Sequence, residues 1–221
     1  MKYKLANSAL LVCLVSISLT HSAARAQSSE GLQSGNKLTT EVITFGTRGR
    51  EIFPASTLIV ESVVEATIDF YTLVRLNNKT TFNRTGHFAV STENAAGVKQ
   101  VPENLQVTWM PPNRDFTKPW QVKYGFQSTQ NCGGGIGQVA LEANSKPVRF
   151  AIRVRGTPTE FDAFEAMMIG TWTSGTCGVG KQIMKFVYVP AINLVAENLS
   201  QGFQSDGFLY SGRTSKVVAI D

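Results

Sequence analysis

Apolar and polar side chains alternate in short segments along most of the chain, and glycine, proline and asparagine separate these segments. The clearest segment is 147–156, in which four apolar residues alternate with three arginines and an alanine. Successive side chains of a β-strand point to opposite faces of a sheet, so this pattern predicts a strand with one apolar face. Similar signatures occur at 42–45, 105–110, 121–126, 138–141 and 183–189.

The segment 66–76 also alternates, and the same rule gives its two faces. We expect Phe70 and Val74 on the apolar face, and Tyr71 and Arg75 on the polar one. The preceding segment, 56–65, places apolar residues at helical spacing, but its β-branched content favours a strand.

One segment favours a helix instead. In 159–169, Phe161, Phe164 and Met168 recur at three-to-four spacing with acidic residues between them. The whole pattern therefore predicts an all-β, mainly antiparallel fold, a β-sandwich or jelly-roll-like barrel, with one short helix near 159–169.

The first 26 residues have the order of a secretory signal peptide. Lys2 and Lys4 precede an apolar run, and small residues lead to Ala26 before Gln27. The run is too short to span a hydrocarbon core, so we expect cleavage rather than an anchor, and no later segment is apolar enough to span a membrane. The sequence thus predicts a secreted or periplasmic protein.

After the leader, residues 27–37 are too polar to pack, and we expect a flexible N-terminal tail. Residues 38–221 contain no internal repeat and no long linker, which favours a single β-rich domain. Cys132 and Cys177 remain as a pair in an oxidising compartment, and we expect a disulfide between them, two free buried thiols being the alternative.

Cleavage changes the charge. It removes three of 21 basic residues and none of 16 acidic ones, so the net charge falls from +5 to +2. Such a charge gives no indication of a nucleic-acid partner. One histidine, His87, remains, which disfavours histidine-based metal sites and Ser-His relays. We expect no cofactor.

The segment 175–181, Gly-Thr-Cys-Gly-Val-Gly-Lys, has the spacing of a phosphate-binding loop, but Gln182 stands where Ser or Thr is needed and a strand is predicted next. Glycines that turn the chain around a bridged cysteine explain it better. A Gly-rich stretch also follows Cys132. The functional alternative to two simple turns is an anion site, in which the exposed backbone amides of both turns bind the anion.

Two groups are candidates for ligand binding. Arg149, Arg153 and Arg155 could form a stripe for an anionic polymer, or they could be the solvated face of an edge strand. Trp109 and Trp120 flank a proline-rich loop. They could stack on sugars at the rim of the fold, or they could cap the core.

Glu160, Asp162 and Glu165 form the densest acidic group and are the remaining candidates for catalysis, although acidic residues on a short helix are far more often its solvated face. The leading hypothesis is therefore a non-catalytic binding or surface-structural module that recognises a carbohydrate or an anionic surface polymer. The alternatives are a carboxylate-dependent hydrolase of an extracellular polymer and a subunit of a surface assembly, joined to a protein partner through an edge strand.

Overall fold

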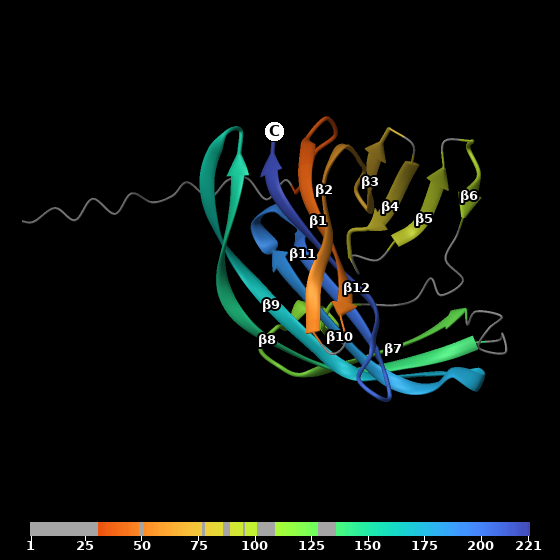
Figure 1. Ribbon diagram of the computed structural model, residues 1–221. Coiled ribbons are helices and arrows are strands. Elements are labelled where there is room, and N and C mark those ends of the chain that lie inside the picture. Colours follow the sequence, from red (N-terminus) through yellow and green to blue (C-terminus); the bar gives the residue numbers. More distant parts are fainter. Residues whose placement is uncertain are drawn as a thin grey trace, which may run out of the picture.

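The computed structural model describes residues 31–48, 51–76, 78–85, 89–94, 96–100, 109–127 and 136–221. Within them the chain forms one 12-stranded sheet in the order β6-β5-β4-β3-β2-β1-β12-β11-β10-β9-β8-β7 (Figure 1). The strands are β1 (Lys37–Arg48), β2 (Glu51–Ala66), β3 (Phe70–Arg75), β4 (Asn78–Asn83), β5 (Ala89–Asn94), β6 (Lys99–Gln100), β7 (Trp120–Gln127), β8 (Ile136–Val154), β9 (Thr157–Ser174), β10 (Gly178–Val189), β11 (Leu194–Gln204) and β12 (Leu209–Ile220).

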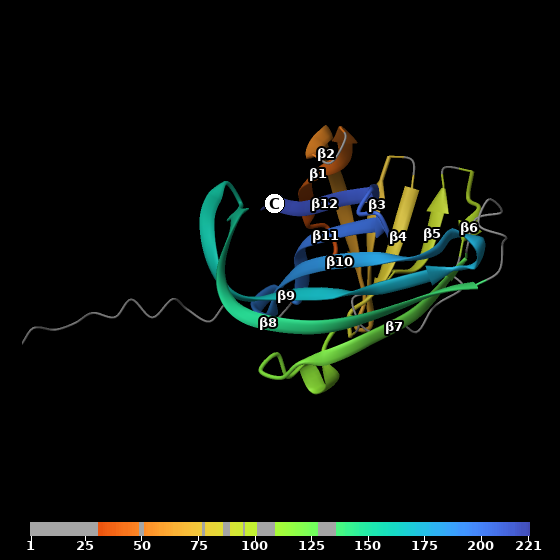
Figure 2. The same ribbon diagram turned by 60° about the horizontal axis from the view of Figure 1, so that its bottom comes forward.

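The prediction of an all-β, mainly antiparallel fold is confirmed. The fold has two layers, and both belong to one curled sheet. Strands β7–β12 run side by side, and β3–β6 cross behind them (Figure 2). The long β8–β9 hairpin bends back until the end of β8 pairs in parallel with the end of β12, Ala219 opposite Arg153 and Ile220 opposite Val154. This pairing closes β8 through β12 into a ring.

The predicted helix at 159–169 is wrong, because these residues lie inside β9. Phe161 and Ala163 are buried on one face of the strand, whereas Ala166 and Met168 are buried on the other. A strand that changes its buried face halfway places apolar residues three to four apart. That spacing imitates a helix.

Two separate cores explain this change of face. One core contains Phe161 of β9 and lies inside the ring, against β1, β2 and β3. The other contains Met168 of β9 and is covered by β7 and the loop before it. Strands β8, β9 and β10 contribute to both, so they run between two cores that lie on opposite faces of the sheet.

The predicted tail is wrong for the part that the structure describes. Leu32 is only 4% exposed and belongs to the core inside the ring. Its N–H donates to the carbonyl oxygen of Ile192 at 3.3 Å, and β1 already begins at Lys37. Residues 27–30 lie outside the described residues, as do the leader, His87, Cys132 and residues 105–108 of one predicted strand.

The predicted faces of 66–76 are inverted. Tyr71 is buried at 4% exposure, whereas Phe70 is 38% and Ile68 93% exposed. Arg75 shares the inward face with Tyr71 because two residues separate successive positions on one face. The prediction that 56–65 is a strand is confirmed, since these residues lie within β2. In the described part of the chain no helix is long and apolar enough to cross a membrane.

Candidate functional site

The predicted arginine stripe is divided between the exposed face of β8, which carries Arg149 and Arg153, and the β8–β9 turn, which carries Arg155. Arg149 lies on the exposed face of β8 and pairs with Asp162 at 2.6 Å and Glu160 at 3.7 Å. The hydrogen bond and charge of Asp162 raise the pKa of the Arg149 guanidinium. Arg153 is exposed on the same strand, whereas Arg155 lies in the β8–β9 turn and lines a cavity at the end of the ring.

The two tryptophans belong to a core. Trp120 is 7% exposed, and its Nε1 donates to the carbonyl oxygen of Trp109 at 3.1 Å. Trp109 is partly buried and packs edge-on against Tyr124, with ring centroids 5.2 Å apart. Stacking of a sugar on Trp120 is therefore excluded, and the alternative of a core-capping pair describes these residues.

The three predicted acidic residues do not converge. Glu160 and Asp162 are exposed beside Arg149. Glu165 pairs with Lys146 at 2.9 Å and Lys185 at 3.7 Å, and the hydrogen bond from Lys146 is the main cause of its lowered pKa. None of the three lines a described cavity. Glu160 and Asp162 form an exposed ion-pair cluster with Arg149, and Glu165 forms a separate, half-buried one with Lys146 and Lys185.

The glycine-rich segment 175–181 is a turn that leads into a strand. Gly175 and Gly178 have φ of 38° and 76°, values that glycine adopts without strain. The lysine is followed by more of β10 and not by a helix, as the sequence predicted. Cys177 is exposed in this turn, and its predicted bridge to Cys132 stays a prediction.

The strongest candidate site is a cleft between the two layers, with a volume of about 290 Å³. Strands β1, β11 and β12 form one wall, and β3 and β4 form the other. Arg213 comes from β12, where it lies opposite Thr44 of β1, and Arg75 comes from the end of β3. The two arginines therefore approach the same space from opposite layers. We call this space the arginine cleft.

The arginines lack acidic partners in the described part of the chain. Arg75 Nε donates to Ser62 Oγ at 3.0 Å, and no described carboxylate pairs with Arg75 or Arg213. Burial, and then the charge of Arg213, lower the pKa of Arg75. Two like charges that face one partly enclosed cleft repel each other until an anion lies between them.

The remaining lining residues of the arginine cleft suit a polar ligand with an apolar face. Tyr71 and Phe82 stack on each other in the wall, with ring centroids 5.0 Å apart. Hydroxyl and amide groups also line the cleft, namely Thr40, Thr80, Asn198 and Ser215, and the rest of the lining is aliphatic. Aromatic rings beside hydrogen-bonding groups are the usual make-up of a small-molecule site.

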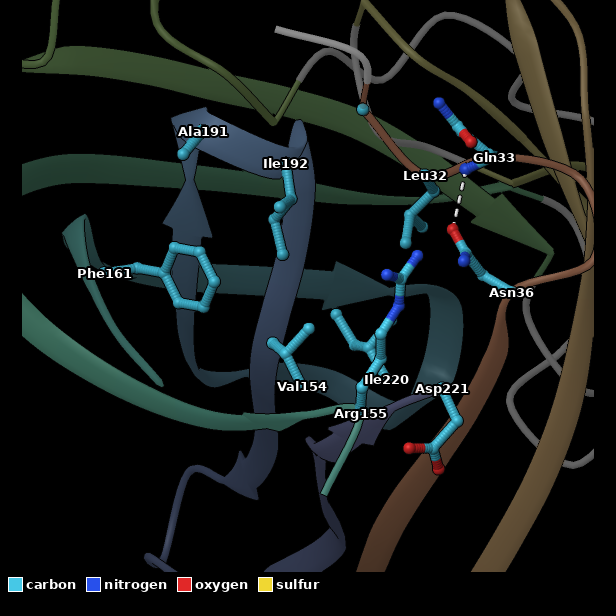
Figure 3. A pocket seen from close by; sticks show the side chains of 11 residues that line it. Leu32, Gln33, Asn36, Val154, Arg155, Phe161, Ala191, Ile192, Ile220 and Asp221 are labelled. Carbon is cyan, nitrogen blue, oxygen red and sulfur yellow. Dashed lines mark hydrogen bonds between the residues drawn. The ribbon is translucent and has the colours of Figure 1, made fainter. Parts of the chain in front are cut away.

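Two further cavities are neighbours of the arginine cleft. One, of about 460 Å³, lies where β3 leaves β2 and is lined by Lys37, Glu61, Arg75 and Asp221. The other, of about 210 Å³, is the cavity that Arg155 lines (Figure 3). Among the described residues no cluster of histidine, cysteine, aspartate and glutamate could hold a metal ion.

Sequence reasoning missed the two central residues. The alternation in 66–76 places Arg75 on the polar face of its strand, and no sequence pattern distinguishes Arg213 from the other arginines. The sequence contains only a weak signal for Arg75. Arg75 lies on the same face of its strand as Tyr71 and Leu73, so a prediction that buries this face would also have placed Arg75 inside the fold.

Comparison with known proteins gives little more. No family model matches the chain, and no curated protein matches it. Among solved structures, the chain is similar to the hypothetical lipoprotein YmcC from Escherichia coli (K12). The identity is 12% and the TM-score 0.44, over 85% of this chain and 89% of that chain. At these values the likeness assigns neither a family nor a function.

Proposed function

We propose that this chain is an exported, non-catalytic binding module that holds an acidic group of a carbohydrate or surface polymer between Arg75 and Arg213. One observation carries the proposal: two guanidiniums face one cleft, and no carboxylate is among the described residues that line it. A guanidinium binds a carboxylate or phosphate through two parallel hydrogen bonds, and an anion between two of them relieves their repulsion.

The lining favours a sugar acid over a simple inorganic anion. Hydroxyl and amide groups can bind sugar hydroxyls, and Phe82, which is half-buried in the wall, offers an apolar surface to a sugar ring. The volume of the cleft is at the lower limit of ordinary ligand sites, which are about 300 Å³ or larger. One sugar acid unit is therefore the expected occupant.

The cleft lacks the groups of a carboxylate-dependent hydrolase. Such enzymes place two carboxyl groups on either side of the bond that is cleaved. Glu160, Asp162 and Glu165 lie outside the arginine cleft, and its lining contains no acid in the part of the chain that the structure describes. The binding module is accordingly preferred over the hydrolase.

The test is calorimetric titration of the purified protein with glucuronic acid and, for comparison, with neutral glucose. We expect glucuronic acid to bind and glucose to bind more weakly. Arg213→Gln should reduce the affinity for the acid by about tenfold or more, because it removes a charged hydrogen-bond donor from the anion. Arg153→Gln is the matched control, an exposed arginine outside the cleft, and should bind as the wild type does.

Two results would overturn the proposal. The first is an affinity for sugar acids that Arg213→Gln leaves unchanged. The second is the absence of binding to any sugar acid by the folded wild-type protein.

A second candidate, a subunit of a surface assembly, is favoured by an edge of β2 that no described strand covers. Residues 51–59 are all exposed, and β3 pairs with β2 only from Val63 onward. The exposed stretch carries Ile52, Phe53, Leu58 and Ile59, which are 38% to 62% exposed. An unpaired edge with apolar side chains can pair with the same edge of a second copy of this chain.

Light scattering after size exclusion, over a range of concentrations, tests this candidate. We expect the wild-type mass to rise with concentration, and the double variant Leu58→Lys and Ile59→Lys to stay monomeric. Ile68→Lys, at an exposed position outside this edge, is the control. A wild type that remains monomeric throughout rejects the candidate.

A further inference from the structure

The cavity at the β8–β9 turn has the features of a second polar subsite (Figure 3). In Figure 3 the Arg155 side chain extends toward the segment that carries Leu32 and Asn36, and the Asp221 carboxylate points away from it. No described carboxylate pairs with Arg155. Its guanidinium can therefore accept an anionic partner.

An amide in a fixed orientation lines the same cavity as this guanidinium. The Oδ1 atom of Asn36 accepts a hydrogen bond from the backbone N–H of Gln33 at 2.8 Å, which sets the orientation of the amide group (Figure 3). No described residue accepts a hydrogen bond from Asn36 Nδ2. A donor beside a cation, with the side chains of Phe161 and Ile192 lining the same cavity, suits an acidic sugar.

The backbone of Arg155 is unusual for its residue type. Its φ is 47°, and that of Gly156 is 79°, so the two-residue turn has the positive φ at both positions that a type I′ turn requires. Asparagine, aspartate and glycine are the usual residues there, and an L-residue such as arginine costs about 1 kcal/mol or more. A strained residue that projects a charge into a cavity is a typical feature of binding sites.

The three cavities form a series. The turn cavity and the middle cavity share Asp221, and the middle cavity and the arginine cleft share Leu38 and Arg75. The N–H of Arg155 donates to the Ile220 carbonyl at 2.8 Å, which places the turn at the end of β12. Arg213 precedes Ile220 by seven residues on β12, a distance of at most about 23 Å at the usual rise of a strand.

We propose that the ligand is a linear acidic polysaccharide that extends from the arginine cleft, through the middle cavity, to Arg155. This inference rests on the proposed function and names its ligand class. The middle cavity contains Glu61 and Asp221 beside Lys37 and Arg75, so it is nearly neutral and disfavours a further acidic unit. The polymer therefore has neutral units between its acidic ones.

Calorimetry with hyaluronan fragments, in which acidic and neutral sugars alternate, tests the proposal. The readout is the ratio of the affinities for an octasaccharide and a disaccharide. We expect a ratio of about ten or more in the wild type, because a second charged contact is worth at least that factor. Arg155→Asn should bring the ratio close to one, and the control Arg153→Gln should preserve it.

Arg155→Asn suits the experiment because asparagine favours the turn, so the variant should fold at least as well as the wild type. Oligogalacturonates of the same lengths, in which every unit is acidic, should show a smaller ratio. An equal or larger ratio for them would contradict the neutral spacing.

The two proposals fail differently. If the disaccharide binds through Arg213 but longer fragments bind no better, the extended site is wrong and the arginine cleft stands. An affinity gain that survives Arg155→Asn also overturns the extended site. If no fragment binds, or if Arg213→Gln has no effect on any fragment, the proposed function itself is wrong.

Discussion

Gly180 of β10 lies against the indole of Trp172, whose Nε1 donates to the carbonyl oxygen of Phe203 at 3.0 Å. A Cβ atom at this position would lie 2.1 Å from that oxygen and 2.3 Å from Cε2 of the indole. Packing thus requires this glycine, and the turn requires Gly175 and Gly178. Together these demands produce the spacing that imitates a phosphate-binding loop.

Gly180→Ala should lower the free energy of unfolding by about 1–3 kcal/mol, the usual cost of overpacking, because backbone and indole both occupy the space of the new methyl group. Denaturant unfolding followed by tryptophan fluorescence measures the change. Gly46→Ala is the control, since its Cβ would meet nothing closer than 3.3 Å. Equal effects of the two substitutions would contradict this account.

Asp115 is a residue whose protonation should affect stability. A hydrogen bond from Thr117 and, after it, one from Lys118 lower the pKa of Asp115 to about 2 from its ordinary value of 3.8. Because the folded-state pKa is lowered, its contribution to stability is present above pH ~4 and is lost as the pH falls toward ~2. Asp115→Asn should therefore destabilise the protein at neutral pH and progressively less below pH ~4.

Urea unfolding of both proteins across this pH range measures the difference between their free energies of unfolding. A difference that does not change with pH would show that Asp115 acts without its charge.

The β8–β9 hairpin shows what single segments could not reveal. Its strands were predicted in pieces, 138–141 and 147–156, and one piece of β9 was assigned to a helix. Each strand buries one face in the first half and the opposite face in the second. Alternation therefore changes phase in the middle, where the strands pass from one core to the other. A prediction from local periodicity assumes that a strand buries the same face along its whole length, so it is wrong where the buried face changes.

The turn of this hairpin allows a prediction about stability. Arg155→Asn should raise the free energy of unfolding by up to about 1 kcal/mol, because asparagine adopts positive φ with less strain than arginine. Thermal or denaturant unfolding provides the measurement, and Arg153→Asn, at an extended position, should not stabilise. A loss of stability in Arg155→Asn would mean that the Arg155 side chain supports the turn in the unliganded protein.

In the part of the chain that the structure describes, the molecule is one sheet with two cores, and the arginine cleft lies where its two layers face each other. Arg75 and Arg213 are far apart in the sequence, and the curl of the sheet brings them to one cavity. The same curl places Arg155 beside the end of β12. Candidate sites chosen from neighbouring residues therefore pointed to the exposed face of β8 instead.

The predicted disulfide between Cys132 and Cys177 would stabilise the chain as a whole. A bridge between Cys132 and Cys177 would close a loop of about 45 residues and contribute up to about 4 kcal/mol. A peptide map without reductant should recover the two cysteines in one linked fragment. Cys177→Ser and the double variant with Cys132→Ser should lose the same stability. Unequal losses, or separate peptides, would favour free thiols.

Export is a further prediction for the whole protein. If residues 1–26 are a cleaved leader, the protein recovered from outside the cytoplasm of a producing cell should begin at Gln27, which N-terminal sequencing determines. An intact N-terminus at Met1 on the extracytoplasmic protein would contradict cleavage.

The sequence by itself determined the strand-rich, antiparallel character of the chain, because alternation over a few residues reflects the geometry of a single strand. It also excluded a nucleotide-binding loop, since that motif is defined by neighbouring residues, and here Gln182 and a strand stand where it needs Ser or Thr and a helix. Tertiary structure decided the rest: which face of each strand is buried, that Trp120 lies in a core, and that three arginines line neighbouring cavities. Those properties depend on which strands of the curled sheet pack against each other, and contacts between distant strands leave no periodic signal in the sequence.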